Sequence, residues 1–196
     1  MRTFIGAGLL SLLVLADPAD AENQRPPLIV AHAALEQTAY TRSYDPAYVR
    51  IAYPNGDPPR DRGVCSDVIV RAFRAAGVDL QKEIHEDMLR SFAAYPHRWG
   101  LAAPDANIDH RRVPNLMTFF TRQGKSLPVS ARREDYAPGD VVAWDLGGGL
   151  LHVGLVSDAP AAGGAGYAIV HNIGAGAQLE DVLFNWKIIG HYRYFR

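Results

Sequence analysis

The segment Cys65–Gly77 reads CSDVIVRAFRAAG and follows a charged, proline-rich loop. Its apolar side chains recur every three or four residues, as they do on one face of a helix. Four of them share that face: Ile69, Ala72, Phe73 and Ala76. Gly77 then supplies a residue that commonly ends helices. The segment therefore predicts a helix with Cys65 in its first turn.

Cys65 is the one cysteine among 196 residues, so it has no partner for an intrachain disulfide. A thiol at a helix N-terminus lies at the positive end of the helix dipole, which favours the thiolate. The unpaired N–H groups there can also stabilise the oxyanion of an acyl-transfer intermediate. The alternative is an inert buried cysteine, because free cysteine is among the most buried residue types.

The rest of the chain predicts an α+β fold, with helices first and strands afterwards. Further helices are expected at Leu28–Ala39, Leu80–Phe92 and Pro114–Gln123. The last third changes to short apolar runs separated by turns, which predict an antiparallel meander. These runs are Asp140–Trp144, Leu151–Ser157, Tyr167–Asn172 and Trp186–Tyr194. Tyr48–Tyr53 also alternates enough to predict a strand.

A nucleophilic thiol needs a base within hydrogen-bond reach and a third group that orients the base. His152 opens the apolar strand after Leu151, and a polar side chain there needs a partner or a cavity. His171 and Asn172 end the next strand and compete for the third role. Since successive side chains on a strand face opposite sides, only one of them can point at His152. We favour His171.

The N-terminus has the pattern of a secretory signal. Arg2 is followed by the apolar run Phe4–Leu15 and by the small-residue cleavage site Ala19-Asp20-Ala21. Residues 1–21 are therefore expected to be a signal peptide, and residues 22–196 a single periplasmic or secreted domain. The apolar run is shorter than a membrane span, so we expect no stable membrane insertion after cleavage. A formal net charge of −1 argues against nucleic-acid binding.

The segment Cys65-Ser66-Asp67, the strand Pro138–Val142, the run His152–Val156 and the end of the next strand at His171 resemble the NlpC/P60 cysteine peptidases. The chain also resembles a bacterial family catalogued as DUF1287. That resemblance covers most of the mature chain, from Tyr44-Asp45-Pro46 through the segment Asn107–Asn115 to His171-Asn172-Ile173-Gly174.

The first resemblance implies a papain-like fold of NlpC/P60 type, with Cys65 as nucleophile, His152 as base and His171 as the orienting residue. It implies hydrolysis of an amide, in peptidoglycan or a cell-wall peptide. The chain departs from the peptidase pattern at Val64, where an aspartate is usual, and at Asp67, where a glycine is usual. Weaker candidates for substrate binding are Tyr53, Asp67, Arg111 and Asn172.

Two other functions compete with a hydrolase. A binding module could keep the fold without the chemistry, and the unusual residues beside Cys65 motivate it. A metal site could use His152, His171 and His110, but zinc sites often show closely spaced ligand pairs, and the sequence has no His-x-x-x-His. We therefore expect no metal, no cofactor and a monomeric protein.

Overall fold

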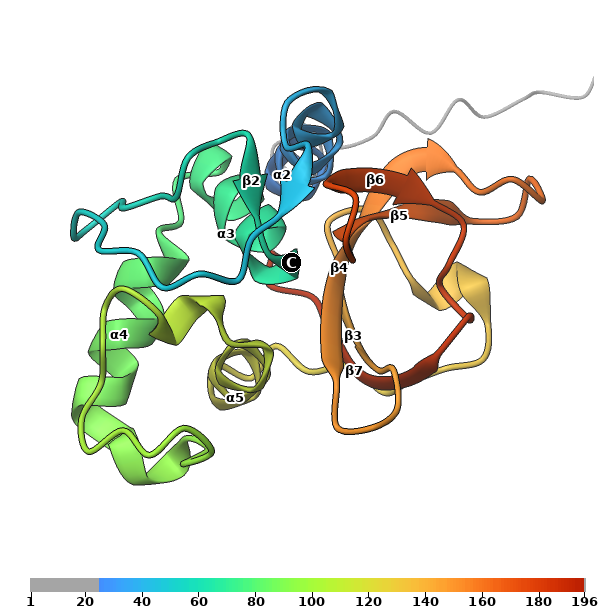
Figure 1. Cartoon of the computed structure of the whole chain (residues 1–196). Coiled ribbons are helices and arrows are strands. Elements are labelled where there is room, and N and C mark those ends of the chain that lie inside the picture. Colours follow the sequence, from blue (N-terminus) through green and yellow to red (C-terminus); the bar gives the residue numbers. More distant parts are fainter. Residues whose placement is uncertain (1–24, 196) are drawn as a thin grey trace, which may run out of the picture.

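The computed structural model describes residues 25–195. The first part of this range is helical and lies to one side of the strands (Figure 1). Its α-helices are α2 (Arg25–Glu36), α3 (Cys65–Ala75), α4 (Leu80–Ser91) and α5 (Val113–Arg122). Short 3-10 turns lie at Gln37–Ala39, Phe92–Ala94, Asp109–Arg111 and Arg133–Asp135. A two-residue parallel pair, β1 (Ser43–Tyr44) with β2 (Arg62–Gly63), leads directly into α3.

The strands of the second part form one five-stranded antiparallel sheet in the order β6-β5-β4-β3-β7. Their bounds are β3 (Val141–Asp145), β4 (Leu151–Pro160), β5 (Tyr167–Asn172), β6 (Ala177–Glu180) and β7 (Lys187–Tyr192). Helices α2 and α3 both pack on β4, the central strand (Figure 1). The fold is therefore α+β.

Side chains alternate across the sheet, and each face contacts its own apolar cluster. Val153 and Leu155 of β4 belong to the cluster that includes Cys65 and Phe73 of α3. On the opposite face a smaller cluster is built from β3, β4, β5 and the segment before β7. Its buried members are Tyr136, Val142, Trp144, Val156, Ile169, Val182 and Leu183. A side chain on β4 thus faces either the helices or this second cluster.

Three expectations about the strands need correction. Tyr48–Tyr53 is not a strand, and the backbone N–H of Ile51 donates to the Asn107 side chain at 3.0 Å instead of to a neighbouring strand. The strand β6 was not expected, because its four residues are too few to show a period. The expected meander also fails for β7, which pairs with β3 and so closes the other edge.

The expected signal peptide, residues 1–21, lies outside the described residues. Within residues 25–195, no helix combines the length and the apolar character that crossing a membrane requires.

Candidate active site around Cys65

Cys65 is the first residue of α3, where the chain leaves an extended conformation at Val64. The backbone N–H of Val64 donates to the Asp67 carboxylate at 2.6 Å. This bond is one half of a capping box, in which a side chain of the first turn reaches back to the residue before the helix. Asp67 thereby holds the turn that presents Cys65.

Asp67 also forms a buried ion pair with Arg111. Arg111 Nε donates to Asp67 Oδ1 at 3.0 Å, and both side chains are 2% exposed. The remaining guanidinium donors reach the carbonyl oxygens of Asp45 and Ala47. The polar atoms of Asp67 and Arg111 are thus paired inside the protein, and their expected part in substrate binding stays a prediction. Their role is to join α3, the 3-10 turn Asp109–Arg111 and the loop after β1.

Asn172 is a second structural tether. Its side-chain amide donates to the carbonyl oxygen of Gly63 at 2.9 Å and to that of Ser43 at 3.3 Å. Gly63 lies two residues before Cys65, so the end of β5 holds the loop that carries the thiol. Asn172 is buried and does not face His152, and its expected place in substrate binding stays a prediction.

On the opposite face of the sheet the structure brings His152 and His171 together. His152 Nε2 lies 2.8 Å from His171 Nδ1. His171 Nε2 lies 2.8 Å from the carboxylate oxygen Oε2 of Glu180 on β6. Three side chains from β4, β5 and β6 thus form one continuous hydrogen-bonded chain. His171 rather than Asn172 occupies the orienting position beside His152.

Aromatic rings surround the two imidazoles. The His152 ring stacks on Trp144 with centroids 5.8 Å apart, and Trp186 contacts the edges of both imidazoles. A Cβ on Gly154 would come within 3.1 Å of both the His171 Cβ and the Trp144 ring. A glycine at this position therefore lets the histidines and the tryptophan pack closely. Burial lowers the pKa of His152 to about 3 and lowers that of His171, so both rings are neutral near pH 7.

The sulfur of Cys65 meets the sheet where β4 and β5 separate. The ladder between these strands begins at Gly154 and His171. Just before that pair, the backbone N–H of Val153 faces the sulfur. Val153 follows His152 directly, but Val153 packs with Cys65 on the helical face, whereas the His152 ring stacks on Trp144 on the other face of the sheet. In the described part of the chain, no hydrogen bond joins Cys65 to His152.

The thiol is protonated in this resting structure. Burial raises the pKa of Cys65 to about 11, and the charge of Asp67 acts in the same direction. The backbone N–H groups of Val153, Ser66 and Cys65 itself lower the pKa, but they do not offset the burial. The helix N-terminus alone therefore does not produce a thiolate here.

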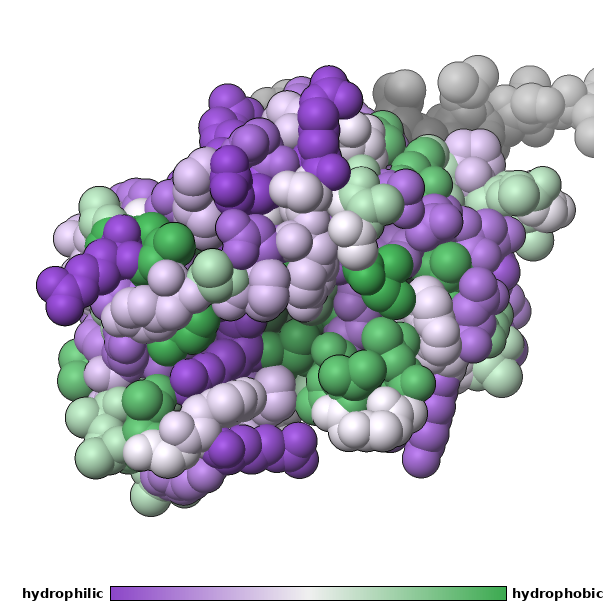
Figure 2. All heavy atoms as spheres, viewed as in Figure 1, coloured by the Kyte–Doolittle hydropathy of each residue, from purple (hydrophilic) through white to green (hydrophobic). Residues whose placement is uncertain are grey.

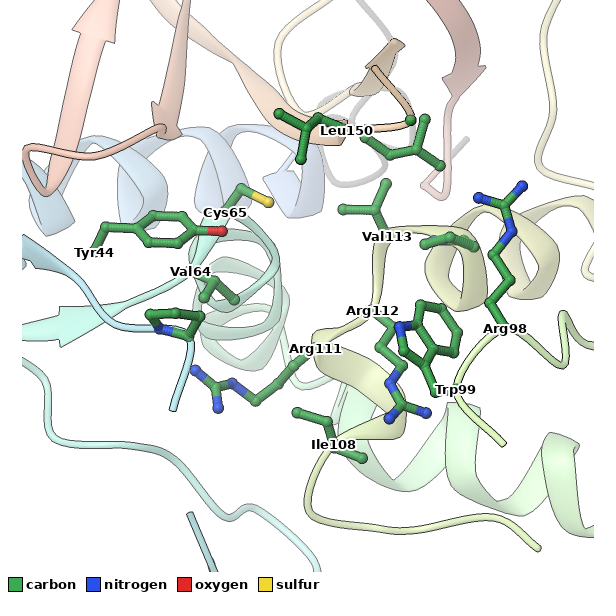
Figure 3. A pocket seen from close by; sticks show the side chains of 14 residues that line it. Tyr44, Val64, Cys65, Arg98, Trp99, Ile108, Arg111, Arg112, Val113 and Leu150 are labelled. Atoms are coloured by element: carbon green, nitrogen blue, oxygen red, sulfur yellow. The ribbon is translucent and has the colours of Figure 1, made fainter. Parts of the chain in front are cut away.

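A cavity of about 360 Å³ opens beside Cys65, between the helical part and the sheet. The sulfur points into it, near Tyr44, Val113 and Leu150 (Figure 3). Apolar side chains gather over the loop between β3 and β4 and in the hollow next to it (Figure 2). Tyr44 lines this cavity, whereas Tyr53 does not and instead packs its exposed ring on His85. The expected role of Tyr53 in substrate binding stays a prediction that this cavity does not support.

The third histidine of the competing metal hypothesis lies elsewhere. His110 is buried in the 3-10 turn Asp109–Arg111, and neither of its ring nitrogens has a hydrogen-bond partner. Its pKa falls to about 3, chiefly because of burial. Among residues 25–195, no group of three or more His, Cys, Asp or Glu side chains could hold a metal ion.

Comparison with known proteins places the chain in a family. Residues 31–194 match the family described as Domain of unknown function (DUF1287). The chain belongs to the DUF1287 family. The described helices and strands from Ala31 to Tyr194 therefore form the DUF1287 domain. This chain is also 57% identical over 168 residues to "Uncharacterized protein YijF" of Escherichia coli (strain K12). The matched region covers 86% of this chain and 82% of YijF.

Sequence reasoning about this DUF1287 chain missed two residues of the site. Glu180 was missed because it lies on β6, a strand too short to predict, and reaches His171 only through strand pairing. Tyr44 was missed because it lies on β1, a two-residue strand too short to predict, and lines the cavity only in the folded structure. An acidic residue shortly after a candidate histidine strand was the only signal for Glu180.

The ion pair between Asp67 and Arg111 gives a stability prediction for the DUF1287 fold. Replacing Arg111 by Met should lower the free energy of unfolding by about 3–5 kcal/mol, because it leaves the Asp67 charge buried and unpaired. Urea unfolding followed by circular dichroism measures this loss. Arg132→Met is the control, because Arg132 pairs with Asp135 on the surface and such pairs contribute about 0–1 kcal/mol. Equal effects of both substitutions would contradict the structural role of Arg111.

Proposed function

We propose that this protein is a thiol hydrolase that cleaves an amide bond, with Cys65 as nucleophile and His152 as base. The observation that carries the proposal is the hydrogen-bonded chain from Glu180 through His171 to His152. Its geometry and charge determine which nitrogen of His152 holds a proton.

The order of protons follows from Glu180. A carboxylate only accepts hydrogen bonds, so His171 Nε2 must donate to it. A neutral His171 then has a lone pair on Nδ1, which accepts a hydrogen bond from His152 Nε2. His152 is neutral as well, so its Nδ1 carries a lone pair. No hydrogen bond occupies Nδ1 in the described structure, and a general base needs such a free nitrogen.

The proposed reaction begins with both groups neutral. When Cys65 Sγ and His152 Nδ1 come within hydrogen-bond distance, the thiol proton passes to Nδ1 as sulfur attacks the carbonyl carbon. The backbone N–H groups at the start of α3 can stabilise the oxyanion. The C–N bond then breaks, and the amine leaves with the proton from His152. Water next hydrolyses the thioester, which releases the acid and restores the thiol.

Glu180 and His171 act through His152 in this scheme and are positioning residues. When His152 gains a proton, its hydrogen bond to His171, and that of His171 to the Glu180 carboxylate, stabilise the positive charge. The Glu180 side chain is 44% exposed, whereas that of His171 is buried. Water can therefore solvate the carboxylate group while the histidines stay buried.

We further propose a papain-like fold of NlpC/P60 type, because the thiol begins a helix that packs on the strand bearing the base. The N-terminal signal pattern supports a periplasmic or secreted location for a monomeric enzyme. Peptidoglycan peptides are then the proposed substrate, since an exported bacterial hydrolase meets that polymer. The residues Val64 and Asp67 replace the peptidase pattern beside the thiol, so the details of substrate binding differ.

Replacing Cys65 by Ala should abolish the release of new amino groups from purified peptidoglycan. The rate should fall by at least about a thousandfold, because removing the nucleophile of such a unit leaves only its binding contribution. Chromatography of the products measures the rate, and unfolding curves verify that the variant is folded. A folded Cys65→Ala variant with full activity would eliminate the hydrolase.

Replacing Glu180 by Gln should lower kcat by about tenfold to a hundredfold with little change in KM. The Gln amide can donate to His171 Nε2 instead of accepting from it, and in that orientation both tautomers reverse and His152 Nδ1 carries a proton. Nitrogen-15 NMR of the imidazoles reads this reversal directly. Gln178→Leu, an exposed change two residues away on β6, is the control and should alter neither kcat nor the tautomers. A proton found on Nδ1 of His152 in the native protein would contradict the assigned order of protons.

A binding module that lacks hydrolase activity is the second candidate. The raised pKa of Cys65 favours it, because a thiol with a pKa of about 11 is ionised in only about one molecule in ten thousand at pH 7. In the hydrolase, a substrate must change this state by bringing the thiol and His152 into contact.

Alkylation by iodoacetamide tests the protonated resting thiol that both candidates share. In the free protein the rate should rise with pH up to about 11, because a raised thiol pKa means that thiolate appears only as pH approaches that value. Cys65 is the single cysteine, so intact mass reports its modification alone. His152→Phe should leave this free-protein profile unchanged. Rapid, pH-independent alkylation near pH 7 would show a pre-formed thiolate and contradict the neutral resting pair.

A further inference from the structure

The cavity beside Cys65 has a second chemical feature away from the sulfur. Arg98, Trp99 and Arg112 lie together across the cavity from Cys65 (Figure 3). Apolar side chains line the space between, including Val113 and Leu150. The cavity thus joins a nucleophile, an apolar wall and a cationic group in a volume that suits a small ligand.

Arg112 is the fixed part of the cationic group. Its guanidinium lies 4.2 Å from the centre of the Trp99 ring, a cation–π contact that sets the plane of the fork. Among the described residues it has no hydrogen bond or ion pair. Partial burial lowers the pKa of Arg112, so part of its hydration is already lost. A half-buried guanidinium with free N–H groups is prepared for an anionic ligand.

Arg111, the residue before Arg112, differs from it because its guanidinium donors already have partners. Arg111 also lines the cavity, but Asp67 and two backbone carbonyl groups occupy its donors. No Asp or Glu side chain is among the residues that line the cavity. Nothing in the cavity wall therefore neutralises Arg112.

The two acidic residues closest to Arg112 have other partners. Asp105 accepts hydrogen bonds from Tyr48 and from Asn107. Asp109 is buried and accepts from the backbone N–H of Asp105 at 2.6 Å. Asp105 and Asp109 weaken the positive field of Arg112, but neither forms a hydrogen bond with its guanidinium group.

We propose that Arg112, held by Trp99 and assisted by Arg98, binds a carboxylate of the substrate whose amide Cys65 attacks. The inference rests on the proposed hydrolase and adds the class of substrate: a short peptide with a free carboxylate beyond the scissile bond. A planar guanidinium matches the two oxygens of a carboxylate. The apolar wall between Arg112 and Cys65 accommodates small aliphatic side chains.

Protection of Cys65 from iodoacetamide tests the site without any turnover. N-acetyl-alanyl-alanine carries the free carboxylate, and N-acetyl-alanyl-alanine amide is its uncharged match. The free acid should slow alkylation at concentrations about tenfold lower than the amide, as expected for one charge-assisted pair. Arg112→Gln should remove this difference, and Arg112→Lys should restore only part of it. Arg50→Gln, an exposed change outside the cavity, should leave it intact.

Three results would overturn the proposal. Equal protection by acid and amide, or none by either, would exclude a carboxylate site. The proposal would also fail if the acid still protected Cys65 better than the amide in an Arg112→Gln variant whose unfolding curve matches that of the native protein. Protection by inorganic phosphate alone would assign the arginines to a different anion. Because alkylation needs no turnover, a carboxylate-selective pocket in a protein without hydrolase activity would refute only the proposed function.

Discussion

The end of β5 is the constraint on which the site depends. His171 and Asn172 are adjacent, so the pleat sends them to opposite faces of the sheet. His171 holds His152 and reaches Glu180, while Asn172 binds the loop that precedes Cys65. One dipeptide thus fastens the helical part to the sheet and orients the expected base. A one-residue shift in the register of β5 would exchange the two faces and break both connections.

The two faces of the sheet bury polar groups in different ways, one as an ion pair and the other as neutral histidines. The ion pair of Asp67 with Arg111 is buried, the backbone N–H of Val64 donates to the carboxylate, and backbone carbonyl groups accept from the guanidinium. It costs desolvation but specifies how α3 and the loops around it meet. The imidazoles of His152 and His171 are buried without a charge of their own, and only the exposed Glu180 gives them direction. A buried ion pair thus stabilises the junction of α3 with its loops, whereas hydrogen bonds between neutral histidines orient the candidate base.

The resting electrostatics have a functional meaning. A buried thiol and a buried imidazole each resist ionisation, since either charge alone would lack solvation. Together, a thiolate and an imidazolium would compensate each other, so ionisation must be concerted with their contact. The cavity beside Cys65 is where a ligand could bring this about. Its cationic side, built from Arg112 on Trp99, is what most separates the pocket from a purely apolar cleft.

The sequence by itself determined the local elements and the chemical candidates. Periodicity located α3, α4, α5 and most strands, and alternation along β5 limited the residue beside His152 to one of His171 and Asn172. The tertiary structure alone decided which polar groups are already paired. Arg111 lies 44 positions from Asp67, and Glu180 nine from His171, so neither pairing leaves a local pattern. Hydrophobic spacing reflects burial of a face, whereas the partner of a buried charge depends on contacts between segments distant along the chain.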